Sequence, residues 1–359
     1  MTGFGGSRKC AALAWFGAAI GSAAIGFNAV WSGQAAAQGA QPTASGPVAD
    51  FYKGKTITLH IGFATGGEYD LQGRLVARFI GRHIPGNPIV IASQMTGAGT
   101  ITLANYLTAV AVKDGTQLGV ISNGLPASQL TGVIGVNYDA RKFFWIGTMA
   151  PTVETMGVWH STGVSTLAAA QEKEVVAGAT NKGSITHTMP ALLNEIFGTK
   201  FRIVTGYRGG SEINLAMERG EVGARNNSWS SWKATKGDWL TSKKLAIIAY
   251  EGPQTADLPG VPLLSRIAKN DADRRVVEVV FSGAYFGRPI VTTPGVPADR
   301  VAALRAAFDA TMKDPEFQAA AAAAKFELAP VRGVDLQKMV DEVLATPAPL
   351  VARAKVLME

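Results

Sequence analysis

A β-like run, a glycine-rich turn and a helix follow one another four times in this chain. The turns lie at residues 65–70, 97–100, 181–184 and 207–211. A helix start presents unpaired backbone N–H groups and the positive end of the helix dipole, and glycine lets a ligand approach that backbone closely. Any one such turn is also what an ordinary α/β domain contains. Four together, in a chain with few catalytic motifs, favour a protein that binds a ligand, above all an anion.

Residues 1–37 have the pattern of a cleavable export signal. Arg8 and Lys9 precede an uncharged apolar stretch at 11–31, and Ala35-Ala36-Ala37 fits the small-x-small rule with cleavage after Ala37. The stretch is also long enough to span a bilayer, so an uncleaved membrane anchor is the alternative. The many small residues and the cleavage motif directly after them favour the signal, and we expect export to the periplasm.

The mature chain would contain no cysteine, because Cys10 is the only one and lies within the signal. Disulfides, thiolate zinc sites and cysteine nucleophiles are therefore excluded. Loss of two basic residues lowers the net charge from +7 to +5, and no basic run or aromatic stripe indicates nucleic-acid binding. Removing 37 of 359 residues leaves 322, which is enough for two lobes with separate cores.

The remaining chain divides into a flexible lead-in at 38–50 and two lobes, the first formed by 51–152 plus 288–359 and the second by 153–287. Strands alternating with helices predict an open, parallel α/β sheet in each lobe. The strand at 153–159 and the segment 279–286 are expected to cross between the lobes, with hinges near 150–156 and 281–290. Ligands of such sheets bind beyond the carboxyl ends of the strands, so all four turns would face a cleft between the lobes.

Motifs of cofactor-dependent and hydrolytic enzymes are missing or incomplete. Gly97-x-Gly99 lacks the third glycine of a dinucleotide fingerprint, because Thr102 stands there. In residues 178–184 the lysine precedes the second glycine of a phosphate loop instead of following it, and no Gly-x-Ser-x-Gly occurs. The four histidines stand in different elements without metal-ligand spacing: His60, His83, His160 and His187. We therefore expect no metal and no cofactor.

For each of two side chains in or near the turns, the sequence is compatible with two different roles. His187 starts a helix just after the turn at 181–184, where it either contacts a ligand or supports the fold. Arg208 either clamps a carboxylate in a bidentate manner or is a solvated loop residue.

In the first turn, Glu68 is expected to point to solvent, and Asp70 to cap a helix that runs to about residue 83. Residues 226–229 could supply hydrogen bonds and a stacking wall, although Trp229 is expected in the core. The alternative to a binding protein is an exported enzyme that uses Glu68, Asp70 or His187 as its acid or base.

Taken in order, the motifs resemble those of a known family. They are the run 51–59, the Gly-Gly-x-x-Asp turn, the Gly-Ala-Gly turn, the segments 113–116 and 206–209, Gly183-Ser184 with His187, and the Pro-bounded segment 253–262. Over about residues 51–345 the chain resembles the periplasmic solute receptors of the tripartite tricarboxylate transporter family, also called the Bug family.

The resemblance implies a type II periplasmic-binding-protein fold, α/β, with two lobes that close on the ligand. It also implies a monomeric receptor that acts without catalysis and delivers a small organic anion (a di- or tricarboxylate, an acidic amino acid or an aromatic acid) to inner-membrane transporter subunits. A receptor that serves signalling is the other reading. With Tyr69 of the first turn added, the implied ligand contacts are Phe63, Thr65, Gly66, Gly67, Tyr69, Gly97, Ala98, Gly99, Thr100, Lys182, Gly183, Ser184, His187 and Arg208.

Four positions depart from the family pattern. Ala64-Thr65 stands where a proline usually precedes Gly-Gly, and Gly99-Thr100 stands where the second turn usually ends in Gly-Gly. Residues 206–209 replace a Pro-Tyr-Lys-Gly, and residues 221–223 replace a Gln-Val-Asp-like segment. Because two departures lie in the carboxylate-binding turns, the resemblance does not carry over the identity of the ligand.

Overall fold

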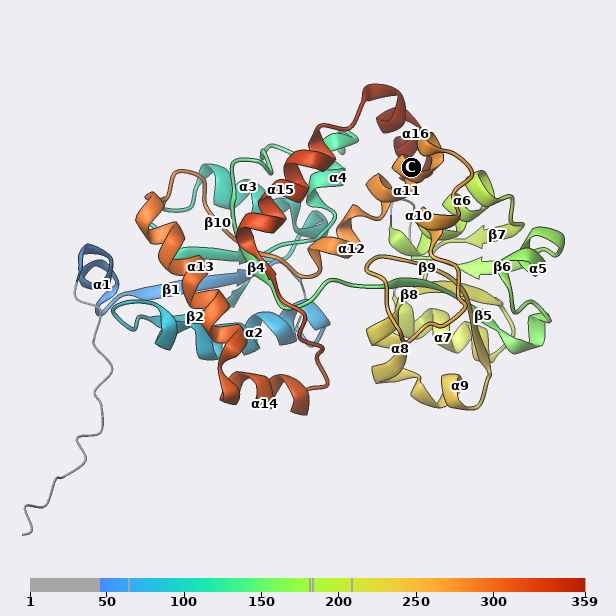
Figure 1. Cartoon of the computed structure of the whole chain (residues 1–359), viewed down its shortest axis with the longest axis horizontal. Helices are drawn as coiled ribbons and strands as arrows, with labels where there is room; N and C mark the ends of the chain where they lie inside the picture. Colours follow the sequence, from blue (N-terminus) through green and yellow to red (C-terminus); the bar gives the residue numbers. More distant parts are fainter. Residues whose placement is uncertain (1–45, 64, 181, 183, 208, 359) are drawn as a thin grey trace, which may run out of the picture. The chain divides into compact units, whose positions relative to one another are not determined.

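The computed structural model describes residues 46–358 apart from residues 64, 181, 183 and 208 (Figure 1). The predicted export signal and residues 38–45 of the lead-in lie outside this range, as do Gly183 and Arg208. No helix among the described residues is both long enough and apolar enough to cross a membrane.

The first lobe is built on a mixed sheet in the order β11-β4-β10-β3-β1-β2. Within the described chain its strands are β1 Thr56–Ile61, β2 Ile89–Gln94, β3 Gln117–Val120, β4 Phe144–Thr148, β10 Ile290–Thr292 and β11 Val331–Arg332. β1 pairs in parallel with β2 and β3, as predicted. β10 is antiparallel to both β3 and β4, so the expectation of a parallel sheet is wrong here. The reason is that the chain re-enters this sheet from the second lobe and runs in the opposite direction.

Helices cover both faces of this sheet. Their bounds are α1 Pro47–Tyr52, α2 Glu68–Ile80, α3 Ile101–Ala109, α4 Leu125–Leu130, α13 Ala298–Lys313, α14 Pro315–Ala323 and α15 Gly333–Leu344, with short 3₁₀ turns η1 Gly81–His83 and η2 Ala98–Thr100. One face packs under α2, α13 and α14, where Phe79, Phe308 and Phe317 are buried. The other packs under α3 and α15, which bury Leu107 and Leu336. This two-sided burial is typical of α/β sheets.

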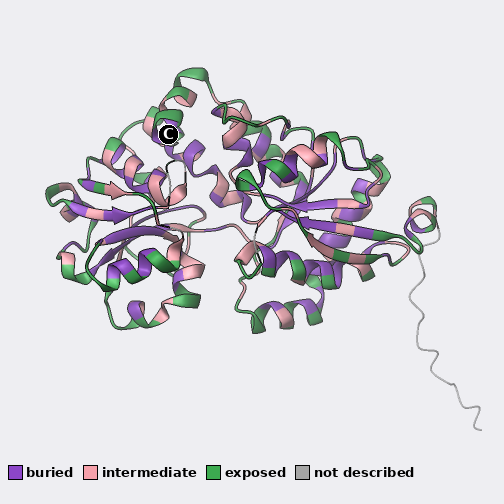
Figure 2. Cartoon of the chain, turned by 180° about the vertical axis from the view of Figure 1, so that it is seen from behind, coloured by how far each residue is buried: buried purple, intermediate pink, exposed green. Residues whose placement is uncertain are grey.

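The second lobe has its own sheet, in the order β7-β6-β8-β5-β9. Its described strands are β5 Glu154–Trp159, β6 Val175–Gly178, β7 Phe201–Val204, β8 Ala224–Ser228 and β9 Leu245–Glu251. Its helices are η3 His160–Thr162, α5 Leu167–Glu172, α6 Ile185–Phe197, α7 Gly210–Glu218, α8 Trp229–Thr235, α9 Gly237–Thr241, α10 Leu264–Ile267 and α11 Asp271–Val280. β6 is parallel to β7 and β8, whereas β5 is antiparallel to β8 and β9. Figure 2 shows the strands of both lobes largely buried and the exposed residues mainly on the outer helices and loops.

Two crossing segments lie against each other between the lobes. One joins β4 to β5, and the other runs from α12 (Ser282–Phe286) into β10. The backbone N–H of Thr152 donates to the carbonyl of Ala284 over 2.7 Å, and the Thr152 hydroxyl donates to the same oxygen over 3.2 Å. The carboxyl end of β4 and the start of β5 thus meet α12 at the hinge regions predicted from the sequence. Residues 279–286, expected as a plain crossover, end α11 and form α12.

Both ends of the described chain differ from the predicted domain limits. Residues 47–50 of the lead-in, expected to be flexible, belong to α1, which begins with a proline and buries Tyr52 completely. The C-terminal helix α16 (Ala348–Met358) contacts α11 and α6, and its Ala354 and Leu357 belong to the second-lobe core. This tail, assigned from the sequence to the first lobe, therefore packs on the second. Only residues 345–347 separate it from α15.

Candidate functional site

The first glycine-rich turn joins β1 to α2 and is tied together by a carboxylate. Asp70 is buried; its Oδ2 accepts the backbone N–H of Gly66 over 3.0 Å, and its Oδ1 pairs with Arg74 at 2.8 Å. The prediction of Asp70 as the N-cap is wrong, because Gly67 has the extended backbone that starts the helix and Asp70 reaches back from its first turn. The Gly66 N–H is thus already occupied by the protein itself.

Gln94, the last residue of β2, forms hydrogen bonds that fix the same turn. The Gln94 amide donates to the Thr65 hydroxyl over 2.6 Å and lies 3.4 Å from the carbonyl of Phe63. Thr65, Gly66 and Gly67 are exposed, so the turn presents its backbone at the surface while its ends are fixed. Such fixing lowers the entropy lost when a ligand binds.

The second turn, at 97–100, has a left-handed backbone throughout. Four successive residues have positive φ, 144° at Gly97, 44° at Ala98, 60° at Gly99 and 74° at Thr100. Two of them carry a Cβ, so the conformation is strained and needs support. Thr100 supplies it: the side chain is fully buried, and its Oγ1 accepts the backbone N–H of Ser122 over 2.9 Å.

The second turn packs closely against the end of β1, from which the first turn starts. A Cβ added to Gly62, at the end of β1, would lie 2.5 Å from Cγ2 of Thr100. Gly97, Ala98 and Gly99 remain exposed beyond this contact. The segments after the carboxyl ends of β1 and β2 therefore present accessible backbone close to the start of α3, which is a suitable place for an anion.

A cluster of aromatic and charged side chains lies beside these turns. The rings of Phe63 and Tyr69 stack with centroids 3.9 Å apart, and the Arg288 guanidinium lies 5.5 Å from the Tyr69 centroid. Arg288 forms an ion pair with Glu68, so the expectation that Glu68 points to solvent is wrong. Burial raises the pKa of the Tyr69 hydroxyl. Arg288 follows α12, some 220 residues after its partner, and sequence reasoning did not identify it.

The second lobe contributes a carboxylate to the same region. Glu154 is the first residue of β5, and its Oε2 accepts the Asn226 amide over 3.0 Å. Burial raises the pKa of the Glu154 carboxyl, while Asn226 and Arg288 act in the opposite direction. Asn226, which sequence reasoning did identify, therefore positions Glu154, which it did not. The available signal was that Glu154 is the first charged residue after the crossing segment.

A buried arginine supports the turn before α7. The Arg225 guanidinium donates to the carbonyls of Gly210 and Asn226 and, over 2.8 Å, to Asn214 Oδ1. Only 4% of Arg225 is exposed, and burial lowers its pKa to about 10. A Cβ on Gly210 would lie 2.6 Å from Nη1 of this guanidinium. The glycine is therefore needed for the arginine to sit under the turn.

The start of α6 carries the remaining described candidates. Ser184 precedes the helix, its hydroxyl lies 2.7 Å from that of Thr186, and Lys182 is exposed. His187 is half-buried, and burial together with the Lys182 charge lowers its pKa. Its Nδ1 is buried and has no hydrogen-bond partner within the described part of the chain. An imidazole with an unused nitrogen therefore lies in the first turn of this helix.

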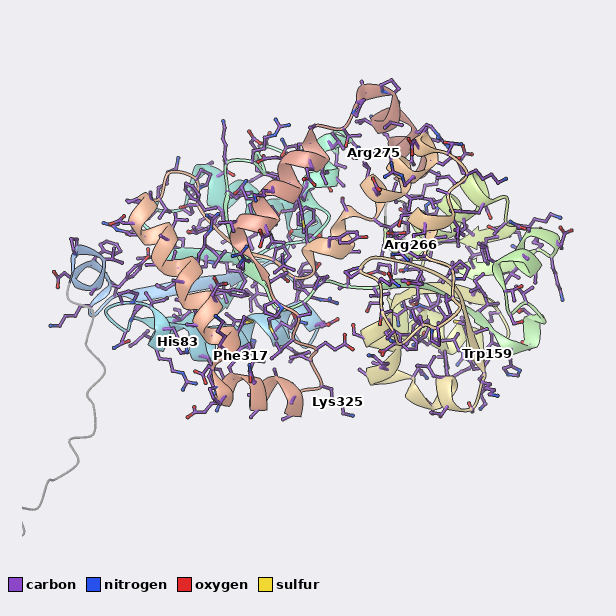
Figure 3. All side chains as sticks on the ribbon, viewed as in Figure 1. His83, Trp159, Arg266, Arg275, Phe317 and Lys325 are labelled. Atoms are coloured by element: carbon purple, nitrogen blue, oxygen red, sulfur yellow. The ribbon has the colours of Figure 1, made fainter. Side chains whose placement is uncertain are left out.

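Trp229 lies at the margin of the second-lobe core instead of within it. Its indole N–H donates to Asp257 over 2.9 Å, and Lys233 pairs with the same carboxylate at 2.8 Å. Lys233 also pairs with Glu327, which follows α14 of the first lobe (Lys325, two residues before Glu327, is labelled in Figure 3). This contact joins the two lobes on the side of α8.

The other histidines lie away from the turns or face into the sheet. His60 of β1 is buried, with Nε2 2.8 Å from Gln117 Oε1. His83 Nε2 lies 2.8 Å from Asp314 Oδ2 before α14 (Figure 3), and His160 is exposed in η3. Among the described residues, no three His, Cys, Asp or Glu side chains are grouped so that they could hold a metal ion.

Comparisons with known proteins concern the fold. No protein-family model matches the chain, and no curated protein matches it. A TctC solute-binding protein from Polaromonas is 20% identical, with a TM-score of 0.63 over 85% of this chain and 98% of that one. Rpa4515 of R. palustris, solved with adipate, is 19% identical with a TM-score of 0.60 over 84% and 97%. The periplasmic binding protein BugD is 18% identical, with a TM-score of 0.59 over 84% and 98%.

These similarities span nearly the full length of the three proteins, at sequence identities that establish a fold and not a ligand. The two lobes, each with a mixed α/β sheet, match the fold of these proteins. The predicted fold class is thereby confirmed. The chain has the two-lobed α/β fold of periplasmic solute-binding proteins.

Proposed function

We propose that this protein is an exported solute receptor of the TctC (Bug) type, which captures a small organic carboxylate and delivers it to inner-membrane transporter subunits. The observation that carries the proposal is the surface formed by the two first-lobe turns. Four residues at 97–100 have positive φ, and the backbone of Gly97, Ala98 and Gly99 is exposed; the exposed turn at 65–67 follows β1, whose end contacts Thr100 through Gly62. Backbone N–H groups held in this way favour a carboxylate without a metal.

The contacts proposed for the ligand are those expected from the sequence. In the first lobe they are Phe63, Thr65, Gly66, Gly67, Tyr69 and residues 97–100; in the second they are Lys182, Ser184 and His187, with Gly183 and Arg208 as predictions outside the described residues. The Polaromonas protein and BugD are binding proteins, and Rpa4515 was solved with a dicarboxylate. These relatives support the ligand class.

Binding without catalysis agrees with the state of the three acid–base candidates. The Asp70 carboxylate is occupied by Gly66 and Arg74, and that of Glu68 by Arg288. The pKa of His187 is lowered, and its Nδ1 has no partner among the described residues to orient it as a base. A general base requires such an orienting group and a pKa near the working pH.

The test is thermal unfolding of residues 38–359 with a panel of dicarboxylates, tricarboxylates, acidic amino acids and aromatic acids. A ligand that binds only the folded state adds about 2.7 kcal/mol at 100 times its dissociation constant. We expect a clear rise in Tm with one carboxylate, recovered unchanged by mass spectrometry. No rise with any anion would contradict the receptor proposal, and recovery of an altered compound would favour the enzyme.

A matched pair of variants tests the surface itself. Thr100→Val keeps the branched shape and removes the acceptor for the Ser122 N–H, so binding should weaken because the turn loses its support. Thr235→Val, on the exposed side of α8, should leave binding unchanged. Equal affinities of the two variants would remove the second turn from the site.

A further inference from the structure

Arg288 is a fixed cation at the crossing between the lobes. Its backbone N–H donates to the Thr148 hydroxyl over 3.0 Å, and only 11% of its side chain is exposed. The guanidinium lies over Tyr69, which is stacked in turn on Phe63 of the first turn. The arginine is thus held beside residues proposed to contact the ligand.

The hydrogen-bonding capacity of this guanidinium is only partly used. Its Nη2 pairs with Oε2 of Glu68, while the other Glu68 oxygen accepts the Gln72 amide over 3.1 Å. Glu68 therefore does not offer both oxygens to the fork in the paired geometry that arginine favours. The Arg288 Nε is buried and has no hydrogen-bond partner among the residues that the structure describes. An unmet buried donor destabilises this arrangement.

The negative charge already beside Arg288 makes the addition of a further anion there electrostatically unfavourable. Glu68 and Glu154 both act on the same region: Arg288 lowers the pKa of Glu154 and Glu68 raises it. Arg225, the other nearby cation, is buried and bonded to neutral oxygens. A ligand carboxylate placed beside the Glu68–Arg288 pair without displacing Glu68 would add a second negative charge to a single cation. An exchange of that carboxylate for Glu68 on Arg288 keeps the charge unchanged.

The Glu68 carboxylate can move away from Arg288 at a small cost in free energy. It is the first residue of α2, and 28% of its side chain is already exposed. Turned to solvent, it stays at the helix N-terminus, where a negative charge is stabilised by the dipole. Gln72, one turn further along the helix, can remain its partner in either position.

We propose that Glu68 is a built-in competitor for the ligand: it occupies Arg288 in the empty protein, and a carboxylate of the ligand displaces it. The inference rests on the proposed function, since it requires an anionic ligand. Arg288 then determines specificity by selecting a carboxylate that can offer both oxygens to the guanidinium. Glu68 sets the affinity, because only ligands that bind Arg288 better than Glu68 does are retained.

The test compares E68Q with wild type for the carboxylate that gives the largest thermal shift, by calorimetry at fixed pH and salt. Gln keeps the shape of the side chain and the contact to Gln72 but removes the charge, so E68Q should bind about fivefold to tenfold tighter. Glu172→Gln, an exposed charge change on α5, is the matched control and should bind like wild type. In E68Q/R288Q the gain should vanish, and R288K should lose part of the binding because lysine lacks the fork.

Each outcome of the calorimetric comparison either supports or overturns the proposed competition by Glu68. Tighter binding in E68Q that requires Arg288, or binding in E68Q where wild type shows none, supports the competitor. Wild-type binding that E68Q leaves unchanged or weakens overturns this inference and leaves the proposed receptor function intact. Failure of every carboxylate to bind wild type and E68Q overturns both. Unfolding midpoints of the variants establish that each is folded before affinities are compared.

Discussion

Gly287 lies where the two crossing segments touch, and replacing it by alanine should disturb the hinge. Its φ of 62° and ψ of −117° form a combination that residues with a Cβ rarely adopt. A Cβ there would lie 2.7 Å from the Thr148 hydroxyl oxygen and 3.0 Å from the carbonyl carbon of Ala150, and closer still to the carbonyl oxygen of Ala150. The obstacles are mainly backbone of the other crossing segment, so a rotamer change cannot relieve them.

Two costs add up in Gly287→Ala. Backbone strain of a Cβ residue at positive φ costs about 1–2 kcal/mol, and forcing two packed segments apart costs about 1–3 kcal/mol more. Gly260→Ala is the matched control, because Gly260 has φ 75° and no atom within 4 Å of an added Cβ. Gly260→Ala should therefore lose stability only through backbone strain at positive φ. We therefore expect Gly287→Ala to lose about 1–3 kcal/mol more unfolding free energy than Gly260→Ala.

Urea unfolding followed by tryptophan fluorescence measures the difference, and titration with the carboxylate of the thermal panel measures its effect on binding. Gly287 precedes Arg288, so separation of the segments should also weaken binding. Equal stability losses in the two variants would refute the reasoning, because they would mean that the crossing segments do not touch at Gly287.

Three further outcomes can be measured on single variants. Glu327→Gln removes the ion pair to Lys233 between the lobes; since 36% of Lys233 and 58% of Glu327 are exposed, the effect should be below about 1 kcal/mol. Single-molecule measurements of the distance between the lobes should show a difference between Glu327→Gln and wild type at low salt. The difference should disappear in about 0.5 M salt, and a salt-independent difference would contradict an ionic contact. Leu357→Ala should cost about 2–4 kcal/mol in urea unfolding, because Leu357 is 6% exposed in the second-lobe core, whereas the control Val356→Ala, at 76% exposure, should cost almost nothing. Burial raises the pKa of Glu154, so the folded protein holds this proton more tightly than the unfolded chain, and its contribution to stability falls as pH rises from the ordinary carboxyl range through the raised pKa. Glu154→Gln should flatten that fall above the ordinary carboxyl range, and an unchanged slope would remove Glu154 as its source.

Sequence reasoning succeeded where the signal is local. The alternation of Ile57, Leu59 and Ile61 predicts β1, and all three are fully buried. The glycine turns predict the strand ends: Gly66, after β1, and Gly97, after β2, both have positive φ. The turn residues of the first lobe that the structure describes do lie at the carboxyl ends of β1 and β2. Their role as ligand contacts stays a prediction.

Contacts between distant segments escaped prediction. Glu68 meets Arg288 across 220 positions, and Asn226 meets Glu154 across 72. No local periodicity encodes such a pair, and each residue alone resembles a solvated polar or charged side chain. The placement of α16 failed for the same reason: an Ala-rich amphipathic helix fits either lobe, and the choice depends on which core leaves room for Ala354.

The two helix starts that frame the proposed site differ in charge, and this difference explains why a lone glycine motif is a weak guide to the ligand. The first turn of α2 contains Glu68 and Asp70, so its dipole is already compensated by the protein's own carboxylates. The first turn of α6 contains no acidic residue; Lys182 precedes it, and His187 lies within it with a lowered pKa. An anion is therefore better accommodated at α6 than at α2 while Glu68 is charged. The exchange proposed at Arg288 would let a carboxylate bind beside α2 without adding to the charge there, so the two ends of a dicarboxylate would meet different chemistry in the two lobes.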